Sequence, residues 1–102
     1  MRKITFHEEA DSEVHEAALY YEERATELGL AFLNEIEKSS QRVLANPMAY
    51  QRVAEEVRQA LVARFPYSIL YVIEADEHIR VIAVAHLKRR PGYWRKRFQM
   101  ET

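Results

Sequence analysis

Apolar residues recur along the first half of the chain with the period of a helix. Four of them, spaced by four, three and four positions, are Ala10, Val14, Ala17 and Tyr21. Residues with this spacing lie on one face of a helix, so the pattern predicts a helix from Glu8 to about Arg24. Residues 2–6 before it alternate between polar and apolar and predict a short strand.

A second amphipathic helix is predicted from about Leu30 to Ala45. Its apolar residues are Phe32, Ile36, Val43 and Leu44. Gly29, just before it, suits the break between the two helices, because glycine adopts the left-handed backbone of a C-cap or turn at low cost. The pair Asn46-Pro47 ends the helix, since the residue before a proline avoids the helical region. Two helices with so short a connection are expected to form an antiparallel hairpin.

In the second half of the chain the apolar period changes to two, which is typical of strands. We expect strands at residues 57–62, 67–74 and 79–87, with a turn or bulge at Phe65-Pro66, a polar turn at 75–78 and a loop at 47–54 before them. The two later strands carry apolar residues on both faces, so they should be central and covered. Short connections make the three strands a β-meander. The predicted fold is α+β, with the order β-α-α-β-β-β and a helical hairpin packed on one face of a small, mainly antiparallel sheet.

Composition limits the class of protein. The chain has 102 residues, of which 48% are hydrophobic and 30% are charged, a balance typical of one folded domain. We expect this domain to span residues 1–102, with residues 98–102 frayed. The absence of cysteine excludes disulfides and thiolate chemistry and fits a reducing cytoplasm. No apolar run approaches the roughly 20 residues of a membrane helix, and no secretory signal is recognised, so we expect a cytoplasmic protein without membrane contact.

Charge is divided unevenly between the two halves of the chain. Residues 1–51 hold five Lys or Arg against ten Asp or Glu, whereas residues 52–102 hold ten against six, within a total net charge of −1. Six of the basic residues lie between His86 and Arg97, around Tyr93 and Trp94, with no acid among them. A basic surface of this kind fits an acidic partner, either nucleic acid or protein. The alternative is a solvated segment in which Trp94 only caps the edge of the sheet.

Few residues offer enzyme chemistry. The four histidines lack the spacing of a zinc site, no Gly-x-Ser-x-Gly motif is present, and the two glycines cannot form a phosphate-binding loop. We therefore expect no metal and no cofactor. The polar residues of the sheet are more informative, because Arg58, Arg80 and His86 would converge with the basic run 88–97 at one end of the sheet. Arginine and histidine suit an anionic target, whether phosphate or carboxylate.

Several motifs follow one another in a fairly specific order and spacing. In the second half they are Phe65-Pro66-Tyr67-x-Ile69-x-Tyr71, then I-x-V-x-A-V-A-His86, then Arg-Arg-Pro91-x-x-Trp94-x-x-Arg97. In the first half they are A-x-x-E-x-x-E-A-A-x-Y-Y-E-E, L-G-L-A-F-L-x-E-I and Asn46-Pro47. Over residues 2–97 this series resembles the ParE/RelE toxin superfamily and, more specifically, the ParE-like plasmid stabilization toxins. The resemblance implies the same β-α-α-β-β-β fold that the periodicity predicts independently.

The resemblance also implies a function. It implies the toxin half of a type II toxin–antitoxin pair, neutralised by a cognate antitoxin whose tail wraps around it, as a homodimer or as a heterotetramer with the antitoxin. ParE-like toxins inhibit DNA gyrase and are not nucleases, whereas RelE-like toxins cut mRNA on the ribosome. The ribonucleases commonly carry an arginine after the first tyrosine of the central strand, where it can stabilise charge on the scissile phosphate. Here that position is Ser68, which supplies no positive charge, so we favour gyrase inhibition.

The favoured interpretation assigns the basic and aromatic run to contacts with the target or the antitoxin. The predicted contact residues are Arg89, Arg90, Tyr93, Trp94, Arg95 and Arg97. The alternative is a RelE-like mRNA endonuclease that uses Arg58, His86 and Tyr93 for phosphate binding and proton transfer. A third alternative is a degenerate family member that forms complexes without being toxic.

Overall fold

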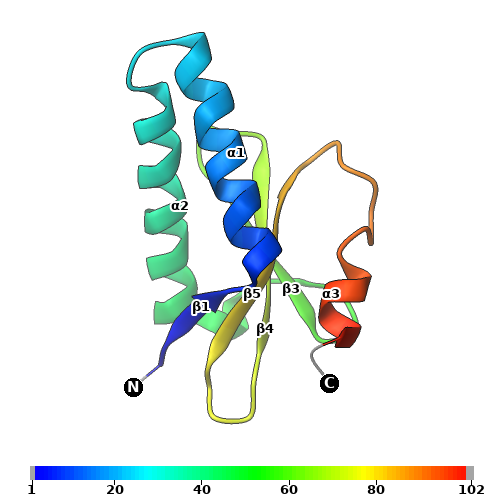
Figure 1. Ribbon diagram of the computed structural model, residues 1–102. Coiled ribbons are helices and arrows are strands. Elements are labelled where there is room, and N and C mark those ends of the chain that lie inside the picture. The colour runs from blue at the N-terminus through cyan, green and yellow to red at the C-terminus, as the bar shows by residue number, and fades with distance from the viewer. Residues whose placement is uncertain (1, 101–102) are drawn as a thin grey trace.

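Two helices lie across one face of a five-stranded sheet, and a third, short helix follows the last strand (Figure 1). The computed structural model describes residues 2–100. In chain order the elements are β1 (Ile4–Phe6), α1 (Glu8–Arg24), α2 (Leu28–Ala45), the 3-10 helix η1 (Pro47–Ala49), β2 (Arg52–Ala54), β3 (Val57–Leu61), β4 (Tyr67–Ile73), β5 (Ile79–His86) and α3 (Arg95–Met100). The predicted α+β class and the helical hairpin packed on a sheet are confirmed. No helix in the described part of the chain is both long and apolar enough to cross a membrane.

The sheet has the strand order β1-β5-β4-β3-β2. Strands β3, β4 and β5 are consecutive antiparallel neighbours, which confirms the predicted β-meander, and β1 joins the sheet by pairing parallel to β5. Strand β2 differs from the prediction, because residues 47–54 form a 3-10 helix and an edge strand where a loop was expected. At three residues, β2 is too short for an alternating pattern to reveal it in the sequence.

The helical hairpin is tighter than its sequence predicts. Helix α2 begins at Leu28, so Gly29 lies inside the helix and the prediction that it forms the break is wrong. The left-handed residue of the turn is Glu27, with φ of 69°, and the Glu22 carboxylate accepts the backbone N–H groups of Glu27 and Gly29, both at 3.0 Å. A Cβ atom on Gly29 would lie 2.5 Å from the carbonyl oxygen of Ala18. The missing side chain therefore lets the two helices approach each other.

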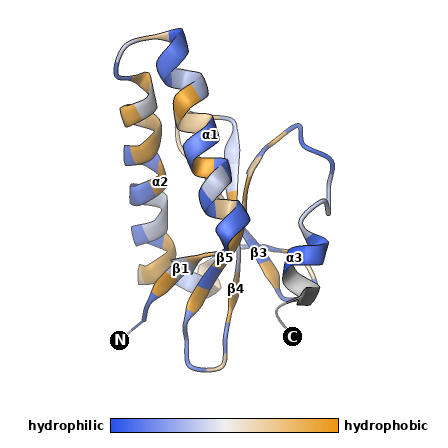
Figure 2. Cartoon of the chain, in the orientation of Figure 1, coloured by the Kyte–Doolittle hydropathy of each residue, from blue (hydrophilic) through white to orange (hydrophobic). Residues whose placement is uncertain are grey.

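The sheet buries an apolar layer on each of its faces. Beneath α1 and α2 lies the helix-covered face, where the fully buried residues include Phe32, Ile69, Tyr71 and Val81. Hydrophobic and hydrophilic residues alternate along both helices as an amphipathic helix requires (Figure 2). The opposite face, which we call the Trp94 face, buries Val57, Leu70, Val72, Ile82, Ala83 and Ala85 together with Trp94.

The described part of the chain ends in the short helix α3. Residues 98–100, for which fraying is predicted, form the last part of α3, and residues 101–102 lie outside the described part of the chain. Helix α3 carries three basic residues and is only six residues long. Because isolated helices of this length are unstable in water, its formation depends on what holds it to the rest of the protein.

Candidate interaction site

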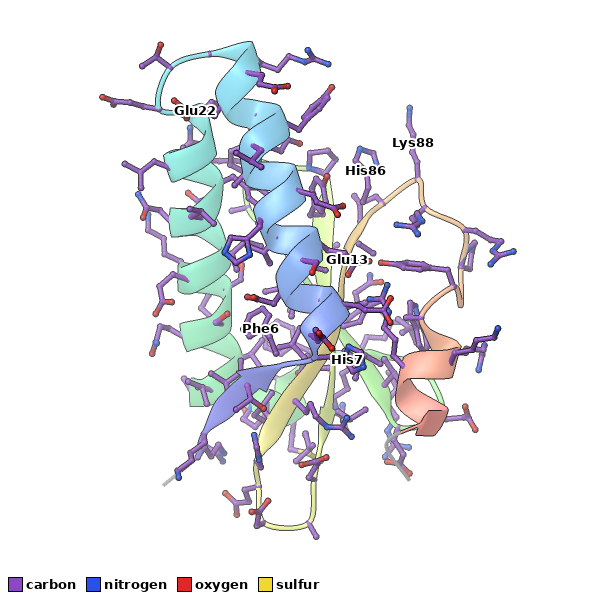
Figure 3. The ribbon with its side chains drawn as sticks, in the orientation of Figure 1. Phe6, His7, Glu13, Glu22, His86 and Lys88 are labelled. Carbon is purple, nitrogen blue, oxygen red and sulfur yellow. The ribbon has the colours of Figure 1, made fainter. Side chains whose placement is uncertain are left out.

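The chain leaves the sheet at the end of β5 and forms an exposed arch before α3. We call residues 87–94 the C-terminal arch. It begins directly after His86, and Lys88 lies in its first part (Figure 3). His86 fixes its start, because the ring Nδ1 accepts the N–H of Lys88 at 3.0 Å and the backbone oxygen accepts the N–H of Arg89 at 2.9 Å. Gly92, with φ of 79°, supplies a left-handed residue that most side chains disfavour.

Glu13 of α1 holds the far end of this arch. Its carboxylate accepts the Tyr93 hydroxyl at 2.6 Å and two N–H groups of the Arg97 guanidinium at 2.9 and 3.0 Å. It also accepts the backbone N–H of Val84 at 2.9 Å, on the side of β5 where β1 has already ended. We call these groups the Glu13 cluster. Because Glu13 faces the arch from α1 (Figure 3), the cluster joins the first helix, strand β5 and the C-terminal segment.

The surroundings of Tyr93 and Arg97 in the Glu13 cluster keep each of these two side chains in one protonation state. Burial, together with the hydrogen bond to Glu13, raises the pKa of the Tyr93 hydroxyl. Burial alone would lower the pKa of Arg97, but the hydrogen bonds and the charge of Glu13 outweigh it and raise that pKa. Arg97 also donates to the backbone oxygen of Ile82 at 3.1 Å. Near neutral pH Tyr93 is therefore a fixed hydrogen-bond donor and Arg97 a fixed cation.

A groove opens between the arch and the Trp94 face of the sheet. We call it the arch groove; its volume is about 260 Å³. Its apolar lining includes Val53, Leu70, Ala85 and Leu87, and its cationic lining consists of Arg89, Arg90 and Arg95. An apolar pocket with charged groups at its border is the usual composition of a binding site, so the arch groove is the candidate site of this protein.

The sequence of this chain matches a known protein family. A model of the ParE toxin of the type II toxin–antitoxin system parDE matches residues 4–91, from β1 into the C-terminal arch. The chain belongs to the ParE toxin family. As a ParE-family protein it is the toxin component of a type II toxin–antitoxin system, and this implies a cognate antitoxin as its partner.

Two solved structures have the fold of this ParE-family toxin. A chain of the chromosomal ParDE toxin–antitoxin system from P. aeruginosa aligns with a TM-score of 0.73 and 17% identity, covering 84% of this chain and 96% of that chain. The isolated E. coli RelE toxin aligns with a TM-score of 0.63 and 18% identity, covering 96% of this chain and 97% of that chain. A search of curated proteins gave no match. At these identities the two structures establish the shared fold, whereas the family model establishes the family.

Three of the six predicted contact residues are exposed on this ParE-family toxin. Arg90 is exposed and has no ion pair within residues 2–100. The guanidinium of Arg89 lies over the Tyr93 ring, 3.9 Å from its centroid, and that of Arg95 is 3.3 Å from the carboxylate of Glu55. Both arginines remain about half exposed, with relative side-chain exposures of 55% and 51%. These three side chains are accessible to a partner.

The other three predicted contact residues have internal roles. Trp94 is 5% exposed and packs on the sheet, and Arg97 is 8% exposed and bound to Glu13. Tyr93 is half-buried between Glu13 and the guanidinium of Arg89. The capping of the sheet by Trp94, the alternative considered for this residue, agrees with its burial. All three residues lie beyond the part of the chain that the family model matches, so their roles are argued from this structure alone.

In the ribonuclease alternative, Arg58 lies apart from His86 and Tyr93, which both line the arch groove. On β3, Arg58 pairs opposite Tyr71 and donates to the backbone oxygen of Tyr50 at 2.6 Å. On β5, His86 pairs opposite Tyr67. These two positions are four residues apart along β4, or about 13 Å at the rise of a strand, and they lie on strands to either side of it. The hydroxyl of Tyr93, the third residue, donates a hydrogen bond to the Glu13 carboxylate.

The predicted convergence of the sheet's basic residues is also wrong. Arg80 pairs opposite Val72 near the start of β5, whereas His86 ends that strand, so about 20 Å of strand separates them. Arg80 instead donates to the Glu74 carboxylate at 2.8 Å. Arg80 and His86 lie near the two ends of one strand, and Arg58 lies on β3 with β4 between, so the three residues do not meet at one end of the sheet.

No role is assigned to Glu13 from the sequence. A signal is nevertheless present, because Glu13 comes three residues after Ala10 and four before Ala17. It therefore lies beside the apolar stripe of α1, where a carboxylate needs a partner. Arg97 is that partner, 84 residues away in sequence, and no local pattern connects the two.

A second acidic group lies in the turn between β4 and β5. Potential ligand atoms of Glu74, Asp76 and His78 are within 4.8 Å of one another. Each of them already has a partner: Glu74 accepts from Arg80, Asp76 accepts the N–H of His78 at 3.1 Å, and the ring of His78 meets the Thr5 hydroxyl at 2.8 Å. We assign these residues to stabilising the turn.

Proposed function

We propose that this ParE-family toxin inhibits DNA gyrase by protein–protein contact and is neutralised by its cognate antitoxin. The observation that carries the proposal is the arch itself. Its exposed cations are Lys88, Arg89 and Arg90, followed by Arg95 and Lys96 at the start of α3. They stand beside an apolar groove, and the segment is held in place by the Glu13 cluster and by the burial of Trp94. A rigid, cationic and partly apolar surface suits contact with an acidic protein surface.

The arrangement of candidate catalytic residues supports contact rather than catalysis. Proton transfer requires the participating groups to lie within about 3 Å of the reacting atoms, or one water away. Arg58 and His86 are too far apart to act on one phosphodiester, and the hydroxyl of Tyr93 is already bound to Glu13. Ser68, at the position where the ribonucleases commonly carry an arginine, is 3% exposed and uncharged.

One observation favours a second candidate function, a RelE-like mRNA endonuclease. His86 and Arg89 line a smaller cavity of about 220 Å³ beside Tyr67, whose ring centroid is 5.2 Å from that of His86. A histidine, an arginine and a tyrosine together could bind and cleave a phosphodiester. The fold shared with the E. coli RelE toxin is compatible with this alternative. In this version of the alternative, Tyr67 and Arg89 take the roles in proton transfer and phosphate binding that the sequence analysis gives to Tyr93 and Arg58.

Two assays on the purified toxin separate these functions. Inhibition of gyrase supercoiling, relieved by the double change Arg89→Glu and Arg90→Glu, is expected from the proposal. Cleavage of mRNA on programmed ribosomes, abolished by His86→Ala, would instead establish the endonuclease. If the toxin shows neither activity and its expression does not arrest growth, both proposed functions are contradicted. The remaining interpretation is then a degenerate family member that forms complexes without being toxic. Changes at Trp94 are unsuitable for these assays, because its burial means that they would also disturb the fold.

A further inference from the structure

The arch groove is formed before any partner arrives. The arch is fixed at one end by hydrogen bonds from His86 and at the other by the Glu13 cluster. Trp94, 5% exposed, is buried against the sheet and cannot close over the groove without leaving its core. A site that needs no rearrangement loses less entropy on binding, so this groove can bind even a short segment of a partner.

Two exposed apolar residues border the groove on opposite sides. Leu87, in the arch, is 54% exposed, and Val53, on edge strand β2, is 43% exposed. Between them Leu70 and Ala85 belong to the buried layer of the Trp94 face. At about 260 Å³ the groove has room for one large apolar side chain rather than for a helix.

Charge around the groove is positive and only partly compensated. Arg95 is paired with Glu55, and Arg89 is 3.9 Å from the Glu13 carboxylate. Within residues 2–100 Arg90 has no ion pair, and neither does Lys88 at the start of the arch. An anionic group of a partner would therefore meet at least one arginine that is not paired with any carboxylate of residues 2–100.

The aromatic residues are not arranged for nucleic acid. Single-stranded nucleic acid binds by stacking its bases on exposed aromatic faces. In this protein Trp94 is buried and the Tyr93 ring is covered by Arg89, with Arg97 at 5.0 Å from its centroid. The exposed apolar residues at the borders of the groove, Leu87 and Val53, are aliphatic instead. Apolar, non-stacking walls beside arginines match an acidic peptide segment better than a nucleotide.

We propose that the arch groove docks an acidic segment of gyrase that inserts one large apolar side chain between Leu87 and Val53 while its carboxylates pair with Arg90 and Arg89. This inference rests on the proposed gyrase inhibition and names the surface and the partner chemistry that produce it. The insertion supplies most of the affinity, and the arginines supply orientation and a rate of association that falls with salt.

The test uses two groove variants and two matched controls of the full chain. Leu87→Asp places a negative charge in the groove wall, and Leu30→Asp makes the same change at a leucine of similar exposure, 56%, on the outer side of α2. Arg90→Glu reverses a charge beside the groove. Its control is Lys3→Glu, which reverses an exposed charge next to β1, at the edge of the sheet opposite to β2. All four positions are exposed, so circular dichroism should show the same fold for every variant.

Binding to purified gyrase and inhibition of supercoiling are measured together. We expect Leu87→Asp and Arg90→Glu to weaken both by about tenfold or more, and the two controls to stay within about twofold of the parent protein. The binding of the parent protein should weaken with salt, and Arg90→Glu should reduce that dependence.

Four outcomes would overturn the inference. Groove variants that inhibit gyrase as well as the parent protein does, but lose binding to the antitoxin, would assign the groove to the antitoxin. Leu87-dependent binding of a single-stranded RNA oligonucleotide would assign it to nucleic acid. A parent protein that does not inhibit gyrase would remove the proposed function and this inference together, whereas inhibition that both groove variants retain removes the inference alone.

Discussion

The two faces of the sheet are covered by different kinds of interaction. On the helix-covered face two long helices bury branched and aromatic side chains, and the rings of Tyr21, Phe32, Phe65 and Tyr67 pack with centroids 4.8 to 6.3 Å apart. On the Trp94 face one tryptophan covers the apolar layer, and the segment that carries it is held by hydrogen bonds and charges around Glu13. The first face is typical of a protein interior, whereas the second has the groove and the exposed cations of an interaction surface.

This difference has a physical reason. Apolar burial is non-directional and its stabilisation is proportional to area, so the larger layer under the helices contributes most of the stability. A polar cluster is directional, so it fixes where the arch lies and leaves the neighbouring cations free for a partner. Stability and recognition are therefore expected to separate by face, and each of the changes below tests that separation.

The largest loss of stability is expected from Phe32→Ala on the helix-covered face. Phe32 is fully buried and contacts three of the other aromatic rings of its cluster. Removing it leaves a cavity and should lower the free energy of unfolding by about 3–5 kcal/mol, a large part of the stability of a domain of this size. Urea unfolding followed by circular dichroism measures this. A loss below about 1 kcal/mol would mean that this face is not the main source of stability.

A smaller and more local loss is expected from Glu13→Gln at the Trp94 face. The change removes the charge that compensates Arg97, which remains buried with its hydrogen bonds incomplete. We expect a loss of about 2–3 kcal/mol, because breaking a largely buried ion pair leaves an uncompensated cation. Amide hydrogen exchange should accelerate in residues 87–97 and much less in α2.

Glu9→Gln is the matched control for this change. Glu9 is on the same helix and its carboxylate is 3.5 Å from the Arg97 guanidinium, but its side chain is 65% exposed. An exposed ion pair contributes at most about 0.5 kcal/mol, so this variant should be close to the parent protein. Equal effects at the two positions would show that the cluster acts through surface charge and not through a specific buried geometry.

Gly29→Ala tests how closely the helix layer is packed. A methyl group would collide with the backbone oxygen of Ala18 on α1, and this should cost about 1–2 kcal/mol after the better helix propensity of alanine is included. Thermal unfolding measures this change. At Gly92, in the arch, a Cβ atom would meet only the flexible side chain of Arg95 at 3.0 Å, so Gly92→Ala would be limited by its backbone conformation and not by packing. A stabilised Gly29→Ala variant would contradict the close approach of the helices.

Gly29 also illustrates which parts of the fold its sequence predicts. The helices and the three long strands follow from apolar periods that persist for several turns or alternations, and these agree with the structure. Gly29 follows a common rule for ending helices, but tertiary packing overrides it, since the position where glycine is needed is decided by the neighbouring helix. β2 and α3 are too short for a periodic signal and depend on contacts with distant residues.

The candidate site is predicted less completely than the fold. The basic run and its aromatic residues are visible in the sequence, but their division into exposed Arg89, Arg90 and Arg95 and buried Trp94 and Arg97 is not. That division depends on Glu13 and on the register of β5, which place a carboxylate of the first helix beside the last residues of the chain. Contacts over such sequence separations leave no local pattern, so the site becomes apparent only once the fold is known.

A smaller effect than those of Phe32→Ala and Glu13→Gln is expected from two tyrosines that act as hydrogen-bond donors, one on each face. Tyr71 donates to the backbone oxygen of Pro47 and Tyr93 to Glu13, both at 2.6 Å. Each change to phenylalanine should lower stability at neutral pH by about 1 kcal/mol, the usual net contribution of one hydrogen bond. The two variants differ in what they release: Tyr71→Phe should leave the arch unchanged in hydrogen exchange, whereas Tyr93→Phe should accelerate exchange in residues 87–94.

Alkaline pH extends the same comparison. Burial raises the pKa of Tyr71 to about 12, and burial with the hydrogen bond to Glu13 raises that of Tyr93 as well. Each folded-state pKa is above the unfolded value of 10.0, so the stabilisation is complete below pH 10 and is lost as the pH rises through the folded-state pKa. The parent protein should therefore lose stability above pH 10, and each phenylalanine variant should lose less. A variant with the same alkaline loss as the parent would mean that its tyrosine is not held neutral by the fold, and for Tyr93 this would remove the evidence that the Glu13 cluster holds the arch in place.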